Sequence, residues 1–572
     1  MQLIIAHKCW RQVNSPTWRS AALLWLSLRT AGFFKHFQGG FDVTTSPTSY
    51  PAPAGPNGPN GTDDPAHRVR VRLAILAAAA VLFLASLGQT SVSTALPIIV
   101  GQLGGLDHIT WVITAYLLAA TVGAPVMGKM GDLFGRRAVL QAGIGVFLAG
   151  AVVSALAPSM GALVAGRFIQ GLGGGGLIVV AMASVADVLP PRQRSKAQGA
   201  LGGVFGLSTV VGPLAGGFIV QHLSWQWIFW VNLPIGLAAF AVLSLALEKR
   251  PARGKPSIDY LGAVLLASTL SCTVLIFSMG GVSLAWTSPG MIALAVGLLL
   301  SLAGFILTER AAKEPILPLG LFRINNFVVC NLVGLIVGGA MFGTITFVPM
   351  FMQVVKGVAP SPSGMFLTPM MLGLIGTSAL AGRVMARTGH YRMMPVISTL
   401  FLGVGMACMA LIGPQTPNWL IAVFVFVAGV GIGPVMSVSV AAIQNAVPRE
   451  SVGVGTASAN MFRLIGGSIG TAVFGAMFST GLIARLGALG IEGVGQGGRL
   501  TGAALAGLSP AERVQVVGAI AEALHPVFWC AAALGLMASA AALLMRERPL
   551  EDVLVPHQAG PRPAEPVRTA AE

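Results

Sequence analysis

The chain has 572 residues, of which 55% are hydrophobic and only 9% are charged, and its mean hydropathy is +0.79. Soluble domains carry about 25% charged residues, so this composition excludes an ordinary soluble protein and predicts a membrane protein. The formal net charge of +16 follows alternate connections between apolar stretches, so it does not indicate a nucleic-acid partner.

Residues 1–68 differ in composition from the rest of the chain. The apolar stretch at 21–34 is too short to span a bilayer and is interrupted by Arg29, and six prolines lie between positions 46 and 65. We expect a disordered or weakly structured N-terminal leader here. The leader could be functionless, or it could be an amphipathic anchor at the membrane interface.

The next part of the chain contains fourteen apolar stretches of roughly 17 to 29 residues. A helix needs about 20 residues to cross a hydrocarbon core about 30 Å thick, and only a helix satisfies its own backbone hydrogen bonds there. The predicted spans, in chain order, are Leu73–Pro97, Ile109–Met130, Ala138–Ala157, Leu163–Leu189, Ala197–Val220, Trp227–Leu247, Leu261–Met279, Met291–Leu307, Phe327–Val355, Phe366–Met385, Pro395–Ile412, Trp419–Asn445, Val454–Ser479 and Pro526–Met545.

Basic residues occur in every second connection between these spans. Residues 129–137 and 249–255 contain several, whereas residues 101–110 and 158–161 contain none. By the positive-inside rule the basic connections lie in the cytoplasm, which places both termini there and requires an even number of spans. We therefore expect a multi-pass protein of the plasma (inner) membrane.

Two of the basic connections share a pattern. Gly128 and Gly135 frame one, Gly382 and Gly389 frame the other, and each pair encloses six residues. The patterns lie eight spans apart, whereas two fused six-helix bundles would place them six apart, so two helices are predicted to be inserted between homologous bundles. The expected organisation is a first bundle (69–247), a linker with two inserted helices (248–308), a second bundle (309–548) with a long outer loop (481–524), and a disordered cytoplasmic tail (549–572).

The first of these connections carries Gly128, Asp132, Gly135, Arg136 and Arg137 in the spacing G-x-x-x-D-x-x-G-R-R. This segment resembles the signature of the major facilitator superfamily, and the chain is similar to its 14-span drug:proton antiporter branch. The resemblance implies an all-α membrane fold of two six-helix bundles plus two inserted helices, 14 transmembrane helices in total. It also implies that this motif is a charge-relay latch that closes the cytoplasmic side; an ordinary solvated loop is the alternative.

A second motif lies in the fifth span. A proline inside a helix kinks it, and small residues on one face let another helix approach closely. The segment resembles the antiporter motif of the family, which is associated with export, although a serine replaces one usual glycine; a packing face without directional meaning is the alternative. Its residues are Gly199, Ser208, Gly212, Pro213, Gly216 and Gly217.

Two arginines lie inside predicted spans. Arg167, followed by Gln170 in the fourth span, resembles a family motif whose arginine faces the central cavity, and Arg463 lies in the thirteenth span. A guanidinium in the bilayer is costly, so each should face a cavity or a partner; a structural tie to the backbone is the alternative. Polar groups expected along the same cavity are Gln89, Thr90, Tyr116, Gln170, Thr344, Gln353 and Asn460.

The first span departs from the pattern of the branch. Gly88 stands where the family usually has an aspartate that is its candidate for proton binding and for attracting cationic drugs. The acidic residues and histidines of the chain lie at span ends, in connections or in the terminal segments. Coupling could therefore use edge groups such as Asp107, Asp132 or Asp187, transport could be uncoupled or an exchange of solutes, or pumping could be lost.

The sequence thus predicts a membrane exporter of amphiphilic small molecules, such as antibiotics, drugs or toxic metabolites, that works by alternating access. Expected partners are the substrate and the lipid bilayer, with protons left open and no nucleic acid; the protein is expected to be a monomer without a metal or other cofactor, and not an enzyme. An uptake or exchange carrier, or a membrane sensor that does not transport, are the alternatives. A cavity with arginines and no carboxylate should favour anionic or neutral solutes.

Overall fold

The computed structural model describes residues 65–92, 94–103, 109–247, 259–280, 284–358, 364–488 and 510–547. These residues form helices joined by short connections, with one isolated bridge between Gly280 and Leu284. Among them, thirteen helical segments are long and apolar enough to cross a membrane, and the helix α17 (Met393–Met409) is apolar but shorter. These fourteen segments correspond in order to the fourteen predicted spans. Of the leader expected at 1–68, residues 1–64 lie outside the described residues, and residues 65–68 belong to the first described helix, which begins at Pro65. The tail expected at 549–572 lies outside the described residues.

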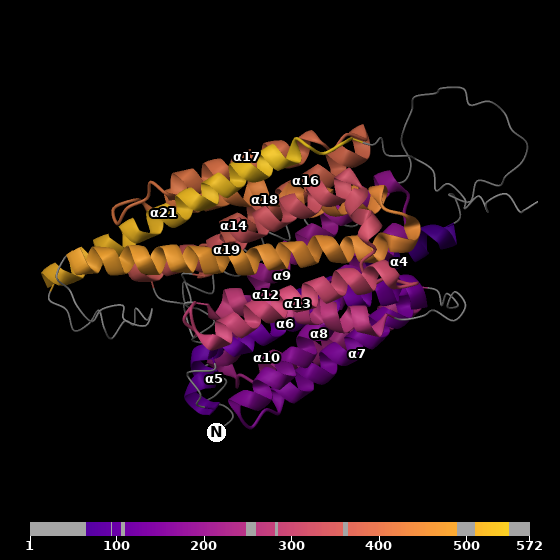
Figure 1. Cartoon of the computed structure of the whole chain (residues 1–572), viewed down its shortest axis with the longest axis horizontal. Coiled ribbons are helices and arrows are strands. Elements are labelled where there is room, and N and C mark those ends of the chain that lie inside the picture. The colour runs from indigo at the N-terminus through magenta and orange to yellow at the C-terminus, as the bar shows by residue number, and fades with distance from the viewer. Residues whose placement is uncertain are drawn as a thin grey trace, which may run out of the picture. The chain divides into compact units, whose positions relative to one another are not determined.

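We call the helices before residue 247 the N-half and those after residue 325 the C-half (Figure 1). The N-half comprises α4 (Pro65–Thr90), α5 (Leu96–Leu103), α6 (Ile109–Phe134), α7 (Arg136–Ala155), α8 (Met160–Val188), α9 (Pro191–His222), α10 (Trp227–Trp230) and α11 (Asn232–Ala246). The C-half comprises α14 (Asn325–Val354), α16 (Thr368–Thr388), α17, α18 (Asn418–Ala446), α19 (Val452–Ala488) and α21 (Pro510–Ala542). Between them lie α12 (Tyr260–Met279) and α13 (Pro289–Ala311).

The first predicted span differs from the structure. The helix α4 ends at Thr90, and a new short helix, α5, begins at Leu96, so Leu73–Pro97 is not one continuous helix. Serine and threonine side chains between the two helices compete for backbone hydrogen bonds, and the Thr94 hydroxyl donates to the Ser91 carbonyl at 3.2 Å. Pro97 occupies the first turn of α5, where its missing N–H costs little.

The predicted long outer loop is partly helical. Helix α19 continues to Ala488 and α21 begins at Pro510, so both helices run past the ends of the predicted spans. Buried apolar side chains on both extensions, including Leu482 and Ile520, hold them together, and Arg485 pairs with Glu522 at 3.3 Å. The prediction of a loop over 481–524 is therefore wrong at both ends, where residues 481–488 and 510–524 are helical. An apolar face continues on both helices beyond the stretch that hydropathy alone identifies.

Glycines of α8 set the packing of the N-half. A side chain at Gly171 or Gly175 would collide with the backbone of α6, and one at Gly173 would lie 2.7 Å from the Phe147 amide nitrogen on α7. The helix axes can approach this closely only because these positions carry no Cβ. The glycine run in α8 therefore serves helix packing.

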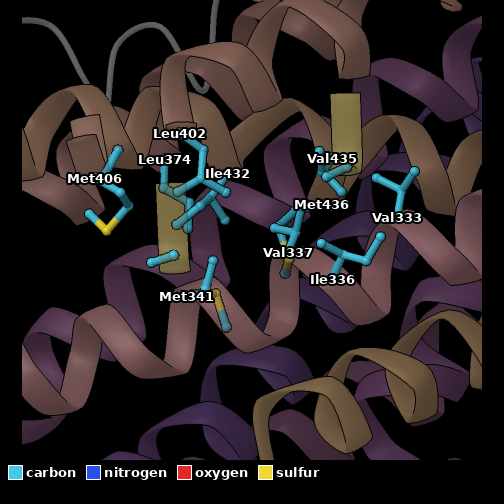
Figure 2. Packing of buried hydrophobic residues seen from close by; sticks show 14 of the residues in the cluster. Val333, Ile336, Val337, Met341, Leu374, Leu402, Met406, Ile432, Val435 and Met436 are labelled. Atoms are coloured by element: carbon cyan, nitrogen blue, oxygen red, sulfur yellow. The ribbon is translucent and has the colours of Figure 1, made fainter. Parts of the chain in front are cut away.

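The C-half has a continuous apolar core with many methionines. Val337 and Met341 of α14, Leu402 and Met406 of α17, and Met436 of α18 are buried in it. Figure 2 shows these side chains turned toward one another across the helices. Methionine fills irregular gaps because its side chain is flexible and polarizable, which suits helices that must pack at several angles.

The inserted helices α12 and α13 form a hairpin. They pack against each other, and the hydroxyl of Thr269 donates to that of Ser301 at 3.1 Å. Helix α12 also packs against α6 of the N-half and α19 of the C-half. The hairpin therefore covers one side of the contact between the halves, and in Figure 1 its helices lie between the N-half and α19.

Candidate functional site

Asp132 joins the two halves at the end of the molecule that carries residues 128–137, which we call the inner end. Its side-chain oxygens accept hydrogen bonds from the backbone N–H groups of Gly453 and Val454, each at 3.0 Å. These N–H groups belong to the first turn of α19, which begins at Val452, and they have no partner within that helix. A carboxylate from the N-half therefore caps a helix of the C-half, where the positive end of the helix dipole favours its charge.

Arg136 holds the carboxylate in place. Its guanidinium pairs with Asp132 one turn earlier and with Asp187 of α8 at 3.3 Å, and the side chain of Asp132 is only 4% exposed. Arg137 donates to the Leu247 carbonyl at 2.9 Å, which ties the same connection to the end of α11. Charge-assisted hydrogen bonds are stronger than neutral ones, so this arrangement fixes the geometry of the capping carboxylate.

The glycines of the motif allow this approach. A Cβ at Gly128 would lie 2.9 Å from the Ala457 Cβ and 3.0 Å from the Gly453 carbonyl oxygen, both on α19. Gly135, between α6 and α7, has a positive φ of 89°, a backbone conformation that glycine adopts without strain. The spacing of the motif therefore reflects one close helix contact and one sharp turn.

The second copy of the pattern makes the corresponding contact. A Cβ at Gly382 of α16 would lie 2.6 Å from the Ser195 carbonyl oxygen and 3.0 Å from the Gly199 Cα on α9, and Gly389 has a positive φ of 73°. The Ser378 hydroxyl donates to the Gly199 carbonyl at 3.3 Å. Both halves thus use the first glycine to touch the other half and the second to turn. Only the first copy carries a carboxylate at its centre.

A second polar contact between the halves lies at the same end. The Gln198 side-chain amide of α9 donates to the Gln444 side-chain oxygen of α18 at 3.2 Å, and both amides donate to the Met182 carbonyl of α8, at 2.8 and 3.3 Å. Gln444 also donates to the Thr456 hydroxyl at 3.0 Å, and Arg194 donates to the Gln444 carbonyl at 3.3 Å. Sequence reasoning missed this cluster, although two glutamines at span ends were a visible signal.

The residues of the antiporter-type motif have two different neighbours. A Cβ at Gly212 or Gly216 would collide with Thr90 or Ser91 at the end of α4, within the N-half, whereas Gly199 faces α16 of the C-half. The Thr90 hydroxyl donates to the Ser208 carbonyl at 3.4 Å. Ser208 is buried and donates to the Val204 carbonyl at 2.8 Å. Pro213 lies inside α9, and a Cβ at Gly217 would have open space around it.

Arg167 lies inside the N-half. Its guanidinium donates to the Gly88 carbonyl at 2.8 Å, the Gln170 side chain at 2.7 Å and the Val112 carbonyl at 3.3 Å, and lies 4.3 Å from the centre of the Tyr116 ring. Arg167 is 1% exposed, and Gln170 and Tyr116 are equally buried. In this conformation the three side chains tie α4, α6 and α8 together and are buried within the N-half.

Gly88 does not point toward open space. A Cβ there would lie 2.5 Å from Phe147 Cζ on α7 and 3.2 Å from the Gln170 side-chain nitrogen. The Phe147 ring therefore occupies the volume in which the usual aspartate side chain would begin.

Arg463 has a different environment. It is half-buried on α19, and its guanidinium lies 5.2 Å from the centre of the Phe205 ring on α9 of the N-half. It donates to the Met436 sulfur at 2.9 Å and to the Asn460 side-chain oxygen. Arg463 therefore lies between the halves and retains some exposure.

The remaining predicted polar groups are dispersed. Gln89 and Thr90 are half-buried at the end of α4, and Gln353 is exposed near the end of α14. Thr344 is buried in the C-half and donates to the Ala340 carbonyl at 2.8 Å and the Met406 sulfur at 3.3 Å. Their roles in a cavity stay predictions.

A pocket of about 480 Å³ lies between the outer parts of α6 and α8, away from the inner end. Val179 of α8 packs against Ala457 of α19 in the C-half. Two residues that line the pocket, Gly161 and Phe168, precede Val179 on α8 by 18 and 11 positions, which is about five and three helical turns. Because about 3.6 residues complete a turn, these positions share one face of α8. That face packs against the C-half near the inner end and lines a pocket nearer the outer end. The lining residues are Trp111, Ala115, Leu118, Gly161, Val164, Ala165, Phe168 and Ile169.

Residues 78–471 match the sequence profile of the Major Facilitator Superfamily. An uncharacterized MFS-type transporter of Mycobacterium tuberculosis (strain ATCC 25618 / H37Rv) is 39% identical over 473 residues, which cover 82% of this chain and 69% of that relative. The multidrug transporter protein MdtP of Bacillus subtilis (strain 168) is 38% identical over 400 residues, which cover 70% and 73%. The human organic anion transporter MFSD10 (TETRAN) has the same fold, with a TM-score of 0.55 at 16% identity over 82% of this chain and 99% of that one.

The family match over residues 78–471, together with thirteen described helices that are long and apolar enough to cross a membrane, identifies a multi-pass membrane transporter and not an enzyme. The chain belongs to the Major Facilitator Superfamily. The predicted all-α major facilitator fold is therefore confirmed.

Proposed function

We propose that this protein exports amphiphilic small molecules across the plasma (inner) membrane by alternating access, with both termini in the cytoplasm. The observation that carries the proposal is the inner latch, in which the Asp132 carboxylate caps α19 of the opposite half. A related chain named a multidrug transporter and the antiporter-type motif on α9 support the direction and the broad substrate range.

The latch can open without stranding a charge. If α19 moves away, Asp132 loses two backbone donors but keeps Arg136, which also contacts Asp187. The carboxylate therefore stays paired in both states, and the cost of opening is limited to the helix-end interaction and its hydrogen bonds, together about 1–3 kcal/mol. Differential binding of substrate to the two states can supply a free energy of that size.

Proton coupling, where it exists, would have to use edge groups. Of the described carboxylates, those of Asp132 and Asp187 lie at the inner end, and both pair with Arg136, which holds Asp132 in place. We propose that protonation of this pair would weaken the latch, because a neutral carboxyl interacts less with a helix N-terminus and with Arg136. Uncoupled transport or solute exchange is the alternative.

The test is reconstituted transport in oriented vesicles with a panel of amphiphiles, while the internal and external pH are set independently. Export predicts net movement from the inner to the outer face, and coupling predicts dependence on the pH difference. Net movement in the opposite direction would establish an uptake carrier. Absence of flux for every compound, with the protein inserted in the membrane, would favour the sensor.

A further inference from the structure

Arg463 lies well inside α19, one of the helices that are long and apolar enough to cross a membrane. It follows Val452, the first residue of α19, by 11 positions, which corresponds to about 16 Å along the helix at about 1.5 Å per residue. The hydrocarbon core is about 30 Å thick, so a helix that enters it near Val452 would carry the guanidinium to about mid-depth. A charge at this depth needs polar partners or an aqueous cavity.

The partners of Arg463 do not match its charge. The Met436 sulfur is a weak acceptor, and the Asn460 oxygen is neutral. Arg463 Nε is buried without a hydrogen-bond partner among the residues that the structure describes. The adjacent Asn460 is 7% exposed, and its side-chain nitrogen is likewise buried without a partner in that part of the chain. Two neighbouring N–H donor groups are thus left without an acceptor.

Arg167 shows what a satisfied intramembrane arginine looks like in the same protein. It has three oxygen acceptors between 2.7 and 3.3 Å and an aromatic face, and it is 1% exposed. Arg463 has one oxygen acceptor, lies between the halves and is half-buried. The first is a structural tie, whereas the second combines unused buried donors with a side chain that keeps some exposure between the halves.

Among the residues that the structure describes, no carboxylate supplies the missing acceptor. The described acidic residues of the helices that pack on α19 lie toward helix ends, as Asp132 of α6 and Asp187 of α8 do, and Glu522 of α21 lies on the outer extension. On α19 itself, Glu450 precedes the first residue. The positive charge of Arg463 is therefore available to an incoming anion.

We propose that Arg463 and Asn460 bind the carboxylate or another oxyanion of an anionic amphiphilic substrate, while Phe205 contacts its apolar part. The inference rests on the proposed export function and specifies its substrate class. Guanidinium and amide N–H groups match oxyanion geometry, and the aromatic ring on the opposite half places the ligand between the two halves. A ligand bound there would contact both α9 of the N-half and α19 of the C-half. The distance between these two helices must change when the halves move during alternating access.

The experiment compares an aromatic carboxylate, its carboxamide and the amine of the same skeleton. Binding is measured on the purified full chain and flux in vesicles of zwitterionic lipid, so that no anionic headgroup competes. Wild type should prefer the carboxylate over the amide by about tenfold, as expected for charge-assisted hydrogen bonds. Arg463→Gln should abolish that preference while the amide binds as before, Asn460→Ala should reduce it, and Arg463→Lys should retain part of it. Arg485→Gln, on the exposed extension of the same helix, is the matched control.

Preference of wild type for the amine, or a carboxylate preference that survives Arg463→Gln, would overturn the inference. If Arg463→Gln does not fold, Asn460→Ala and Arg463→Lys decide, and an unchanged preference in both would overturn it too. Export of the amide without preference for the carboxylate would leave the proposed function standing and remove the anion site. Carboxylate binding that depends on Arg463 without net export would support the site and remove the proposed function.

Discussion

Replacing Gly88 by aspartate introduces the residue that the family resemblance predicts at this position, yet the structure predicts that the substitution alone is harmful. The new Cβ would lie 2.5 Å from Phe147 Cζ, so the ring must move within a well-packed interface between α4, α7 and α8. Overpacking of this kind costs about 1–3 kcal/mol. We expect Gly88→Asp to lower the melting temperature of the purified protein and to leave the dependence of transport on the pH difference as it is in wild type.

Truncating the ring should make room for the carboxylate. Phe147→Ala alone leaves a cavity and should cost about 3–5 kcal/mol. In the double variant Gly88→Asp/Phe147→Ala, the new side chain fills part of that cavity beside Gln170, whose side-chain nitrogen has no partner among the described residues, and near Arg167, which already contacts the Gly88 backbone. The loss of unfolding free energy in the double variant should therefore be smaller than the sum of the losses in the two single variants, by about 1 kcal/mol or more.

The assay is a double-mutant cycle on thermal unfolding of the purified protein, with transport at several pH differences measured in parallel. Strict additivity would refute the reasoning, because it would mean that the two positions do not share one volume. A Gly88→Asp variant as stable as wild type would refute it as well.

Three further predictions concern the inner end. Asp132→Asn should slow transport by about tenfold or more, because the helix-end contact loses its charge; Asp132→Glu is the charge-keeping control, and unchanged flux in the asparagine variant would contradict the latch. Gln444→Leu should weaken the closed inner end by about 1–3 kcal/mol by leaving buried polar partners unsatisfied; protease or thiol-labelling access at the inner end should increase, and unaltered access would count against it. Gly128→Val should block closure by colliding with α19, whereas Gly145→Val, on an exposed face with nothing within 4 Å, should not; equal flux in both would exclude the steric argument.

Much of the architecture was predictable because its causes are local. Apolar length identified the spans, and the repeated glycine frame is the basis for predicting two homologous halves with an inserted pair of helices. The motif predicts a latch role for Asp132, and the structure shows that its carboxylate contacts the other half. The sequence did not indicate the partners, because Gly453 and Val454 act through backbone N–H groups that any sequence would supply at a helix start. The glutamines at 198 and 444 meet only because α9 and α18 cross at their ends.

The two intramembrane arginines show where sequence reasoning stops. Both lie in apolar helices and both were expected at the cavity. Which neighbours each one meets depends on tertiary packing: Arg167 meets a backbone carbonyl that Gly88 leaves accessible, and Arg463 meets a thioether and an amide. Phe147 likewise occupies the space beside Gly88 that a larger side chain would need. These two residues are 59 positions apart in the chain, so no local sequence pattern could have predicted their contact.

The most direct test of the alternating-access account is a pair of distances measured by spin labelling in lipid. One pair of labels spans the inner end, at Ala138 of α7 and Arg387 of α16, and the other spans the outer end, at the exposed Leu156 and Leu411. Adding a transported substrate, or introducing Asp132→Asn, should lengthen the inner distance and shorten the outer one in the same population. Two distances that stay fixed, or that change in the same direction, would contradict the account.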